Sequence, residues 1–388
     1  MQFTSPSDLY WPFSQLDSRY FKALAQHFPP YLPSPPLYPV IVMSTTSQVA
    51  CASLGLFIID DLVFRTANAD GSFTEIKRLK AQIGGGGTYA MIGARVWLPP
   101  TRVGILVDRG SDWPQEMEKA LREYGEEMWV FREKPHELTT RALNLYTGEH
   151  RDFEYLTPRT RLEPIDLPAP LRTSEYLHFV CSPTRALVIH SQLQPPVNST
   201  PSWRPKLVYE PIPERCTPDE LPSLRKILPH IEVFSPNHEE AWALFGVGPK
   251  EVARRGKEGI EEVARKFYDE GAGGAVVIRS GPLGAYAVKK GEENGVWVPA
   301  FHSYEDGRVT GKVVDVTGAG NSFLGGLMAG LVLHPGDLKT AVQHASVAAS
   351  YIIEQFGLPT VQRGEDGTEL WNGVYPAVRL VELQQRST

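Results

Sequence analysis

The stretch of sequence that decides the fold covers residues 312–331 and reads KVVDVTGAGNSFLGGLMAGL. Two valines, Val313 and Val314, are expected to end a short apolar strand, and the small residues 317–320 then form a tight turn. Residues 322–333 are expected to form an apolar helix rich in small residues. Backbone N–H groups of such a turn converge at the positive end of the helix dipole, where they bind anions. The stretch therefore predicts an anion hole that suits a phosphoryl group in transit.

Size and composition are those of an ordinary globular protein. The 388 residues suffice for one large α/β domain or two ordinary ones, with 42% hydrophobic and 22% charged residues. The formal net charge of −6 argues against direct nucleic-acid binding, which usually needs a basic face. Three cysteines without a Cys-x-x-Cys pair favour neither zinc nor disulfides, so we expect a reducing, cytoplasmic setting. No apolar run approaches the roughly 18 residues of a membrane span, and no membrane partner is expected.

The first 43 residues differ from the rest of the chain. They are rich in proline and aromatic residues, have no helical or strand period, and lack the basic and apolar regions of a signal peptide. Two interpretations are open. Residues 1–43 are either a disordered, Pro-rich tail, or a spurious extension ahead of a true start at Met43.

Residues 44–388 are expected to form one domain. Apolar strand candidates, such as 50–59 and 275–279, alternate with helical segments. This pattern predicts an α/β fold, a three-layer sandwich whose mainly parallel central sheet is covered by helices on both faces. The segments near 62–83 and 130–157 are candidates for a small β lid. A segment near 191–205, rich in Pro, Ser and Thr, is expected to be an inserted loop.

Signatures of several other enzyme classes are missing from the sequence. There is no Gly-x-x-x-x-Gly-Lys-Ser/Thr loop, no Gly-x-Gly-x-x-Gly after a strand, no His-Glu-x-x-His and no Gly-x-Ser-x-Gly. P-loop nucleotide hydrolysis, dinucleotide binding, zinc proteolysis and nucleophile-elbow hydrolysis are therefore not supported.

Four other motifs occur in a fixed order. They are Gly84-Gly85 before a small-residue helix, Asn237 to Glu240, the strand and glycine turn from Ile278 to Gly284, and Asp315 to Phe323. Their order and spacing over residues 50–360 resemble the ribokinase-like (PfkB) family of carbohydrate and nucleoside kinases, most of all its fungal maintenance-of-killer branch. The resemblance implies a ribokinase-like fold, ATP and magnesium as cofactors, a sugar or nucleoside as the small-molecule partner, and a homodimer formed through the lid.

The resemblance implies an acceptor site at the first motif. Asp60 would grip two sugar hydroxyls, for which an acceptor-only carboxylate is suited; a solvated residue at a strand end is the alternative. Gly84 and Gly85 would lie beside the acceptor. Tyr89 occupies the position of an Asn that touches the sugar in ribokinases. A larger side chain there argues against ribose itself, and plain core packing is an equal alternative.

The resemblance also implies which residues would bind the nucleotide and the metal ion. Asn237 and Glu240 lie on one helical turn, where Glu240 would hold magnesium through water; the alternative is a helix N-cap with a solvated Glu. Arg279 replaces a Thr common in the family and either pairs with a nucleotide phosphate or lies on the surface. Gly281 and Gly284 would line the nucleotide.

Asp315 and the turn that follows it complete the expected site. The resemblance implies a monovalent cation at Asp315, with turn capping as the alternative. Gly318, Ala319 and Gly320 must be small, either so that backbone approaches phosphate or so that helix and sheet pack closely.

One residue departs from the family pattern. The family's signature has an Asp as general base where this chain has Asn321, and an amide cannot take up a proton near neutral pH. Loss of a general base usually costs roughly 10²–10⁴ in rate, although alignment and charge neutralisation still promote phosphoryl transfer. No other base is evident, and Glu239 or Asp61 would have to be argued from a structure.

Two functions therefore stay open. The first is an ATP-dependent phosphotransferase of the PfkB type, weak because of the Asn at the base position. The second is a catalytically inactive pseudokinase that binds ligands or proteins, for example in the maintenance of cytoplasmic double-stranded RNA virus particles.

Overall fold

The computed structural model describes residues 48–386 apart from 69, 148–149, 195–202, 303, 306–307, 310–312 and 366. The tail or extension expected at 1–43 lies outside the described residues, as does part of the loop expected near 191–205. Among the described residues, no helix has the combined length and apolarity that crossing a membrane requires.

The main sheet of the described part of the chain has nine strands, in which seven consecutive strands run parallel, the next pairs antiparallel with them, and the last pairs antiparallel with that one. Its strands are buried along most of their length because helices cover both faces. In spatial order they are β13 (Val296–Val298), β12 (Ala285–Val288), β11 (Ala275–Arg279), β10 (Val233–Phe234), β9 (Lys206–Pro211), β8 (Tyr176–Cys181), β1 (Cys51–Ser53), β4 (Val103–Gly110) and β5 (Trp129–Lys134).

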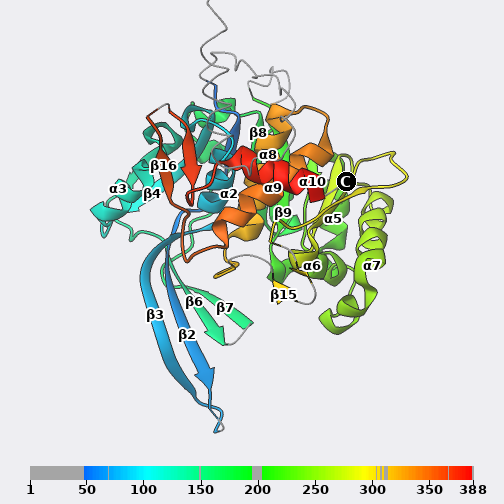
Figure 1. Ribbon diagram of the computed structural model, residues 1–388, viewed down its shortest axis with the longest axis horizontal. Helices are drawn as coiled ribbons and strands as arrows, with labels where there is room; N and C mark the ends of the chain where they lie inside the picture. Colours follow the sequence, from blue (N-terminus) through cyan, green and yellow to red (C-terminus); the bar gives the residue numbers. More distant parts are fainter. Residues whose placement is uncertain are drawn as a thin grey trace, which may run out of the picture. The chain divides into compact units, whose positions relative to one another are not determined.

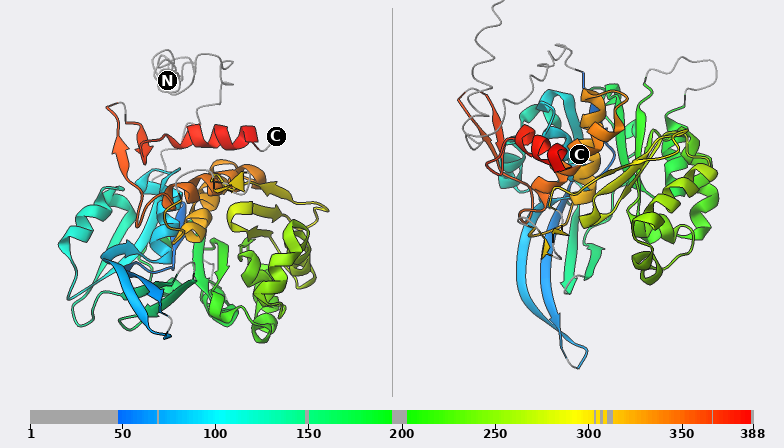
Figure 2. Two further views of the ribbon diagram at one scale, coloured as in Figure 1. Left: turned by 60° about the horizontal axis from the view of Figure 1, so that its bottom comes forward. Right: turned by 45° about the vertical axis from the view of Figure 1, so that its right-hand side comes forward.

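Two hydrophobic cores lie on the two faces of this sheet. Successive residues of β11 alternate between them: Val277 belongs to one core, and Val276 and Ile278 to the other, as expected for a strand with period two. The two helical layers are visible on opposite sides of the sheet in Figures 1 and 2. The first layer contains α2 (Gly86–Arg95), α3 (Gln115–Arg122), α8 (Ala319–Leu333), α9 (Leu338–Ile352) and α10 (Pro376–Arg386). The second contains α4 (Pro183–Gln192), α5 (Leu221–Ile227), α6 (His238–Ala243) and α7 (Pro249–Asp269).

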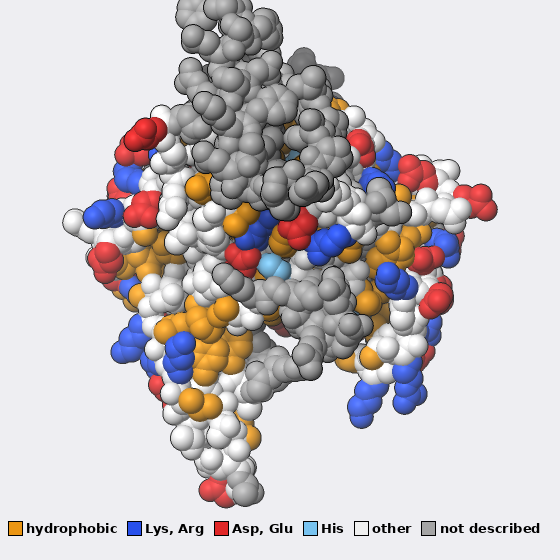
Figure 3. All heavy atoms as spheres, in the orientation of Figure 1, with side chains coloured by type: hydrophobic (Ala, Val, Ile, Leu, Met, Phe, Trp, Pro, Cys, Tyr) orange, Lys and Arg blue, Asp and Glu red, His pale blue; other side chains and the backbone are white. Residues whose placement is uncertain are grey.

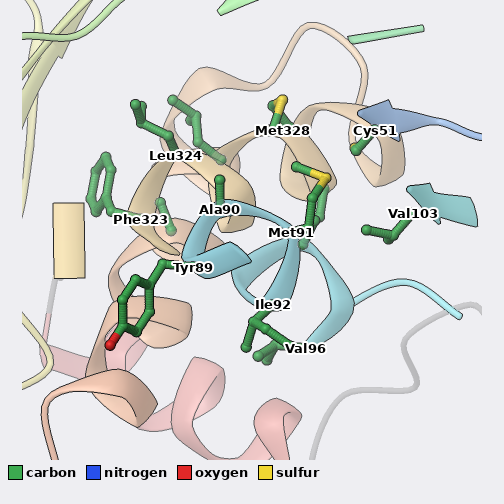
Figure 4. Close-up of a cluster of buried hydrophobic side chains, with 14 of the residues drawn as sticks. Cys51, Tyr89, Ala90, Met91, Ile92, Val96, Val103, Phe323, Leu324 and Met328 are labelled. Atoms are coloured by element: carbon green, nitrogen blue, oxygen red, sulfur yellow. The ribbon is translucent and has the colours of Figure 1, made fainter. Parts of the chain in front are cut away.

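Helices α2 and α8 approach to backbone contact because both carry glycines where they meet. A Cβ on Gly93 would lie 2.1 Å from the backbone oxygen of Ser322, and one on Gly325 would lie 1.7 Å from that of Ala90. Larger side chains such as Met91 and Leu324 fill the core around this contact (Figure 4). The close packing brings the N-termini of both helices to the same edge of the sheet.

A second, smaller sheet projects below the main sheet in Figure 1. Its order is β3 (Phe73–Gly84), β2 (Ile58–Ala67), β6 (Arg141–Thr147) and β7 (His150–Tyr155), with β2 and β6 parallel and the other neighbours antiparallel. Figure 3 shows hydrophobic side chains gathered near its base, and acidic and basic side chains interspersed over the rest of the visible face. The predicted α/β sandwich with a mainly parallel sheet and a small β lid is confirmed.

Two short hairpins complete the fold: β14 (Tyr304–Glu305) with β15 (Arg308–Val309), and β16 (Val361–Arg363) with β17 (Glu369–Trp371).

Two local predictions were wrong. Residues 50–59 are not one strand, since β1 ends at Ser53 and β2 begins at Ile58 in the other sheet. Residues 313–316 form no strand. Val314 and Val316 are 51% and 66% exposed, so these apolar side chains have no sheet face to cover.

Candidate active site

A cavity of about 420 Å³ opens where the carboxyl ends of the central strands meet the small sheet and the N-termini of α2 and α8. The sequence-predicted site residues that line it are Asp60, Gly85, Tyr89, Asn237, Glu240, Arg279, Gly318, Gly320 and Asn321. The other five, Gly84, Asp315, Ala319, Gly281 and Gly284, do not line it. Neither Glu239, which is exposed, nor Asp61, which accepts a hydrogen bond from Ala81 N, lines the cavity.

The turn before α8 is built as an anion hole requires. Gly318 has a φ of 79°, in the left-handed region that favours glycine, and α8 begins at the next residue. The amide of Ala319 donates to Val316 O, and that of Ser322 makes the first full helical bond to Gly318 O. Among the described residues, the backbone N–H groups of Gly320 and Asn321 are therefore the first-turn donors that have no helical acceptor.

Asp315 holds the shape of this turn. Its Oδ1 accepts hydrogen bonds from Thr317 N (3.0 Å) and Thr317 Oγ1 (2.8 Å). The Thr317 hydroxyl also contacts the Tyr146 hydroxyl at 2.5 Å, which ties β6 of the small sheet to the turn. Asp315 thus occupies the turn-capping position that was one of its two expected roles.

On the acceptor side, Asp60 lies within β2 rather than at the end of a central strand, and it is buried. Its carboxylate closely approaches the chain at Gly84, where a Cβ would lie 1.9 Å from Asp60 Oδ2. Two residues further on, a Cβ on Gly86 would lie 3.3 Å from Asn321 Nδ2. The glycine segment therefore touches Asp60 at one end and Asn321 at the other, so the structure brings these two predicted residues to one cavity.

Tyr89 is both a core residue and a cavity residue. It is 5% exposed, and its ring packs on the turn before α8, where a Cβ on Gly318 would lie 2.3 Å from the ring. In Figure 4 its hydroxyl points away from the neighbouring apolar side chains.

Glu210 is the central residue that the sequence analysis missed. It lies near the end of β9 and its Oε2 accepts a 2.7 Å hydrogen bond from Asn321 Nδ2. Its other oxygen, Oε1, lies 2.8 Å from Nη2 of Arg279. A signal was present, because Glu210 follows the buried strand residues 207–209, and polar residues at the carboxyl ends of parallel strands commonly face the ligand.

Arg279 bridges two buried carboxylates. Its Nη2 contacts Glu240 Oε2 at 3.3 Å as well as Glu210, and donates to Ser235 O at 3.1 Å. The side chains of Arg279, Glu210 and Glu240 are only 11%, 10% and 7% exposed. The guanidinium also lies against the anion hole, since a Cβ on Gly320 would lie 2.0 Å from Arg279 Nη1.

Glu240 is held in this position by its own helix. Asn237 is the N-cap of α6, and the two residues form a reciprocal capping box, with both side-chain-to-backbone hydrogen bonds at 2.8 Å. Asn237 is therefore the expected N-cap, but Glu240 is buried at the cavity rather than solvated.

The two carboxylates titrate in opposite directions. Burial alone would raise the pKa of Glu210, but Arg279 and His178 outweigh it and hold that pKa below its usual value. Burial raises the pKa of Glu240 to about 7, with Glu210 adding to the effect and Arg279 opposing it. Near neutral pH the site therefore keeps Glu210 ionised and Glu240 partly protonated.

These residues supply donors for a phosphoryl group, whereas the carboxylates nearest to them are already paired with a guanidinium. The guanidinium of Arg279 already supplies positive charge between the carboxylates of Glu210 and Glu240. Among the described residues, no group of three or more His, Cys, Asp or Glu side chains could hold a metal ion. The backbone cradle at Gly320, with Arg279 beside it, offers amides and a guanidinium, which are ordinary phosphate donors.

Comparison with known proteins gives consistent matches. A model of the pfkB family of carbohydrate kinases matches residues 208–362. An uncharacterised protein of Schizosaccharomyces pombe is 33% identical over 355 residues, which cover 88% of this chain and 94% of that protein. The protein MAK32 of Saccharomyces cerevisiae is 32% identical over 349 residues, 85% of this chain and 91% of MAK32. Ribokinase from Cryptococcus neoformans, solved in complex with ADP, has the same fold: its TM-score is 0.59 at 18% identity, over 87% of this chain and 100% of that one.

Proposed function

Because this chain belongs to the PfkB family of carbohydrate kinases, in the branch of MAK32, we propose that it transfers a phosphoryl group from ATP to a hydroxyl of a sugar-containing small molecule, with Glu210 as the proton acceptor. The terminal phosphoryl group leaves ADP and bonds to the acceptor oxygen. The hydroxyl proton passes to the carboxylate of Glu210.

The observation that carries this proposal is the 2.7 Å hydrogen bond between Asn321 Nδ2 and Glu210 Oε2. It puts a carboxylate within one hydrogen bond of the position where related kinases have their base. The amide of Asn321 orients that carboxylate, and the lowered pKa of Glu210 keeps it ionised at neutral pH. A low pKa also makes a weak base, so we expect slow turnover.

Charge neutralisation falls to the anion hole and Arg279. The first-turn amides of α8 would bind the moving phosphoryl group, and the neighbouring guanidinium would offset its negative charge. Asp60, across the glycine segment, would accept hydrogen bonds from other hydroxyls of the acceptor. Magnesium enters no step here; if it binds with the ATP phosphates, Glu240 would face it through water and would share its charge with Arg279.

A specific observation favours a second candidate, a ligand-binding protein without turnover. The Glu210–Arg279–Glu240 network is neutralised internally, and the guanidinium already lies against Gly320. Such a protein would still bind its ligand but would not transfer the phosphoryl group. The role in virus-particle maintenance that the MAK32 branch implies would act through a protein partner in the cytoplasm.

ATP consumption against a panel of sugars, nucleosides and their phosphate esters separates the two candidates. For the kinase we expect slow turnover by the wild type and faster turnover by Asn321→Asp, because two adjacent carboxylates share a proton and raise one pKa toward neutrality. Turnover only in Asn321→Asp, or ATP binding without turnover in both, would favour the second candidate. A wild type that binds no nucleotide would contradict both.

A further inference from the structure

The cavity continues into a second hollow of about 590 Å³ beside β7 and the start of α4. Three arginines, Arg159, Arg161 and Arg185, line both spaces, so the two are continuous. Arg215 lines only the second one.

The second hollow has a strong excess of positive charge. Four of its lining residues are arginines, and only Glu214 is acidic, in a chain whose formal net charge is −6. A surface of mixed charge would not concentrate cations in this way. The hollow is therefore a local exception to the charge of the protein.

Two of these arginines are paired and two are not. Arg185 lies 3.3 Å from Glu163, and Arg215 is paired with Glu220. For Arg159 and Arg161, the described part of the chain provides no ion pair. Arg159 interacts with Tyr155 instead, since its guanidinium lies 5.5 Å from the centre of that ring.

We propose that the molecule bound in this cavity carries a phosphate monoester, held by Arg159, Arg161 and Arg185, while its free hydroxyl lies toward Asn321 and Glu210. Guanidinium groups bind phosphate oxygens in a forked, charge-assisted geometry, and three arginines that line one hollow suit a dianion. The shared cavity lets one small ligand reach both ends. The assignment of the hydroxyl end rests on the proposed function; the assignment of the phosphate end does not.

Binding measurements test this without relying on turnover. Isothermal titration of the full-length protein would use D-ribose with D-ribose 5-phosphate, and adenosine with AMP, at equal ionic strength. In at least one pair we expect the phosphate ester to bind about tenfold tighter than its neutral partner or better. The pair with the preference tells a sugar phosphate from a nucleotide. The double variant Arg159→Gln with Arg161→Gln should remove that preference, because it should weaken the binding of the ester about tenfold more than that of the neutral partner.

A matched control removes two exposed arginines elsewhere. Arg172→Gln with Arg204→Gln changes the net charge equally but alters no residue of either hollow, and should keep the preference. Equal binding within both pairs, no binding by either, inorganic phosphate as tight as the ester, or a preference that survives the double variant would overturn the proposal. If the arginine-dependent preference is found but ATP is never consumed, the proposed kinase function fails and this inference stands.

Discussion

Asn321 donates a 2.7 Å hydrogen bond from its side-chain amide to the carboxylate of Glu210, a residue 111 positions earlier in the chain. An amide replaces the family's carboxylate at the start of α8, but the site still has an ionised oxygen. The negative charge lies at the end of β9 instead, where Arg279 holds it.

Replacing Glu210 tests its role as proton acceptor. We expect Glu210→Gln to lower kcat by roughly 10²–10⁴, because Gln keeps the shape but cannot take up the proton. The measurement is ATP turnover with the best acceptor. Glu239→Gln is the control, since Glu239 is exposed and lies outside the cavity. A kcat for Glu210→Gln within twofold of the wild type would rule Glu210 out.

Removing Arg279 should destabilise the fold. Arg279→Met leaves Glu210 and Glu240 buried without their cation, and breaking such a network typically costs about 3–5 kcal/mol in the free energy of unfolding. Urea denaturation measures the loss. Arg254→Met, at an exposed position, should change stability by less than about 0.5 kcal/mol. Equal stabilities of the two variants would show that the network contributes nothing.

The raised pKa of Glu240 predicts a pH dependence of stability. Its pKa of about 7, against a usual 4.5, means that the folded state binds a proton more tightly than the unfolded state. The contribution of Glu240 to the free energy of unfolding is therefore fully present below about pH 4.5 and is lost as the pH rises through 7. It amounts to on the order of 3 kcal/mol in all. Urea denaturation between pH 5 and 8 should show that the free energy of unfolding of the wild type falls relative to that of Glu240→Gln as the pH rises. Parallel curves would contradict the shift.

Glu210 contributes with the opposite sign. Because its pKa is lowered on folding, its stabilisation is present above the usual pKa of 4.5 and is lost only as the pH falls below that value. Glu210 therefore contributes no change between pH 5 and 8. Burial lowers the pKa of His344 to about 4, so His344 also changes stability in this window, and the difference between the wild type and Glu240→Gln removes that shared contribution.

The contact between α2 and α8 predicts a contrast between two glycines. Gly325→Ala should destabilise the protein by about 1–3 kcal/mol, because its Cβ would meet the oxygen of Ala90 at 1.7 Å. Gly248→Ala, with no atom within 4 Å of its Cβ, should change stability by less than about 1 kcal/mol. Thermal melting of both variants provides the comparison. A Gly325→Ala protein as stable as the wild type would mean that the two helices can separate freely.

Features set by neighbours in the sequence were predictable. The turn at Gly318 and the pairing of Asn237 with Glu240 each depend on residues three or four apart, so their spacing carries the information. The division of residues 50–59 between two sheets was not predictable from the sequence, because an apolar run fits either sheet equally well.

The salt-bridge network depends on tertiary structure. Glu210 meets Arg279 only because β9, β10 and β11 are neighbours in the central sheet, and strand order is not written in local spacing. The same holds for the arginine-lined hollow, whose walls come from the loop after β7 and from α4.

The hydroxyl contact between Tyr146 and Thr317 has a consequence for ligand binding. Any displacement of β6 either carries the turn before α8 along with it or breaks that contact. In the proposed kinase, this contact would couple the binding of the acceptor to that of the donor through the position of the small sheet. By reciprocity, each should change the affinity of the other by the same factor.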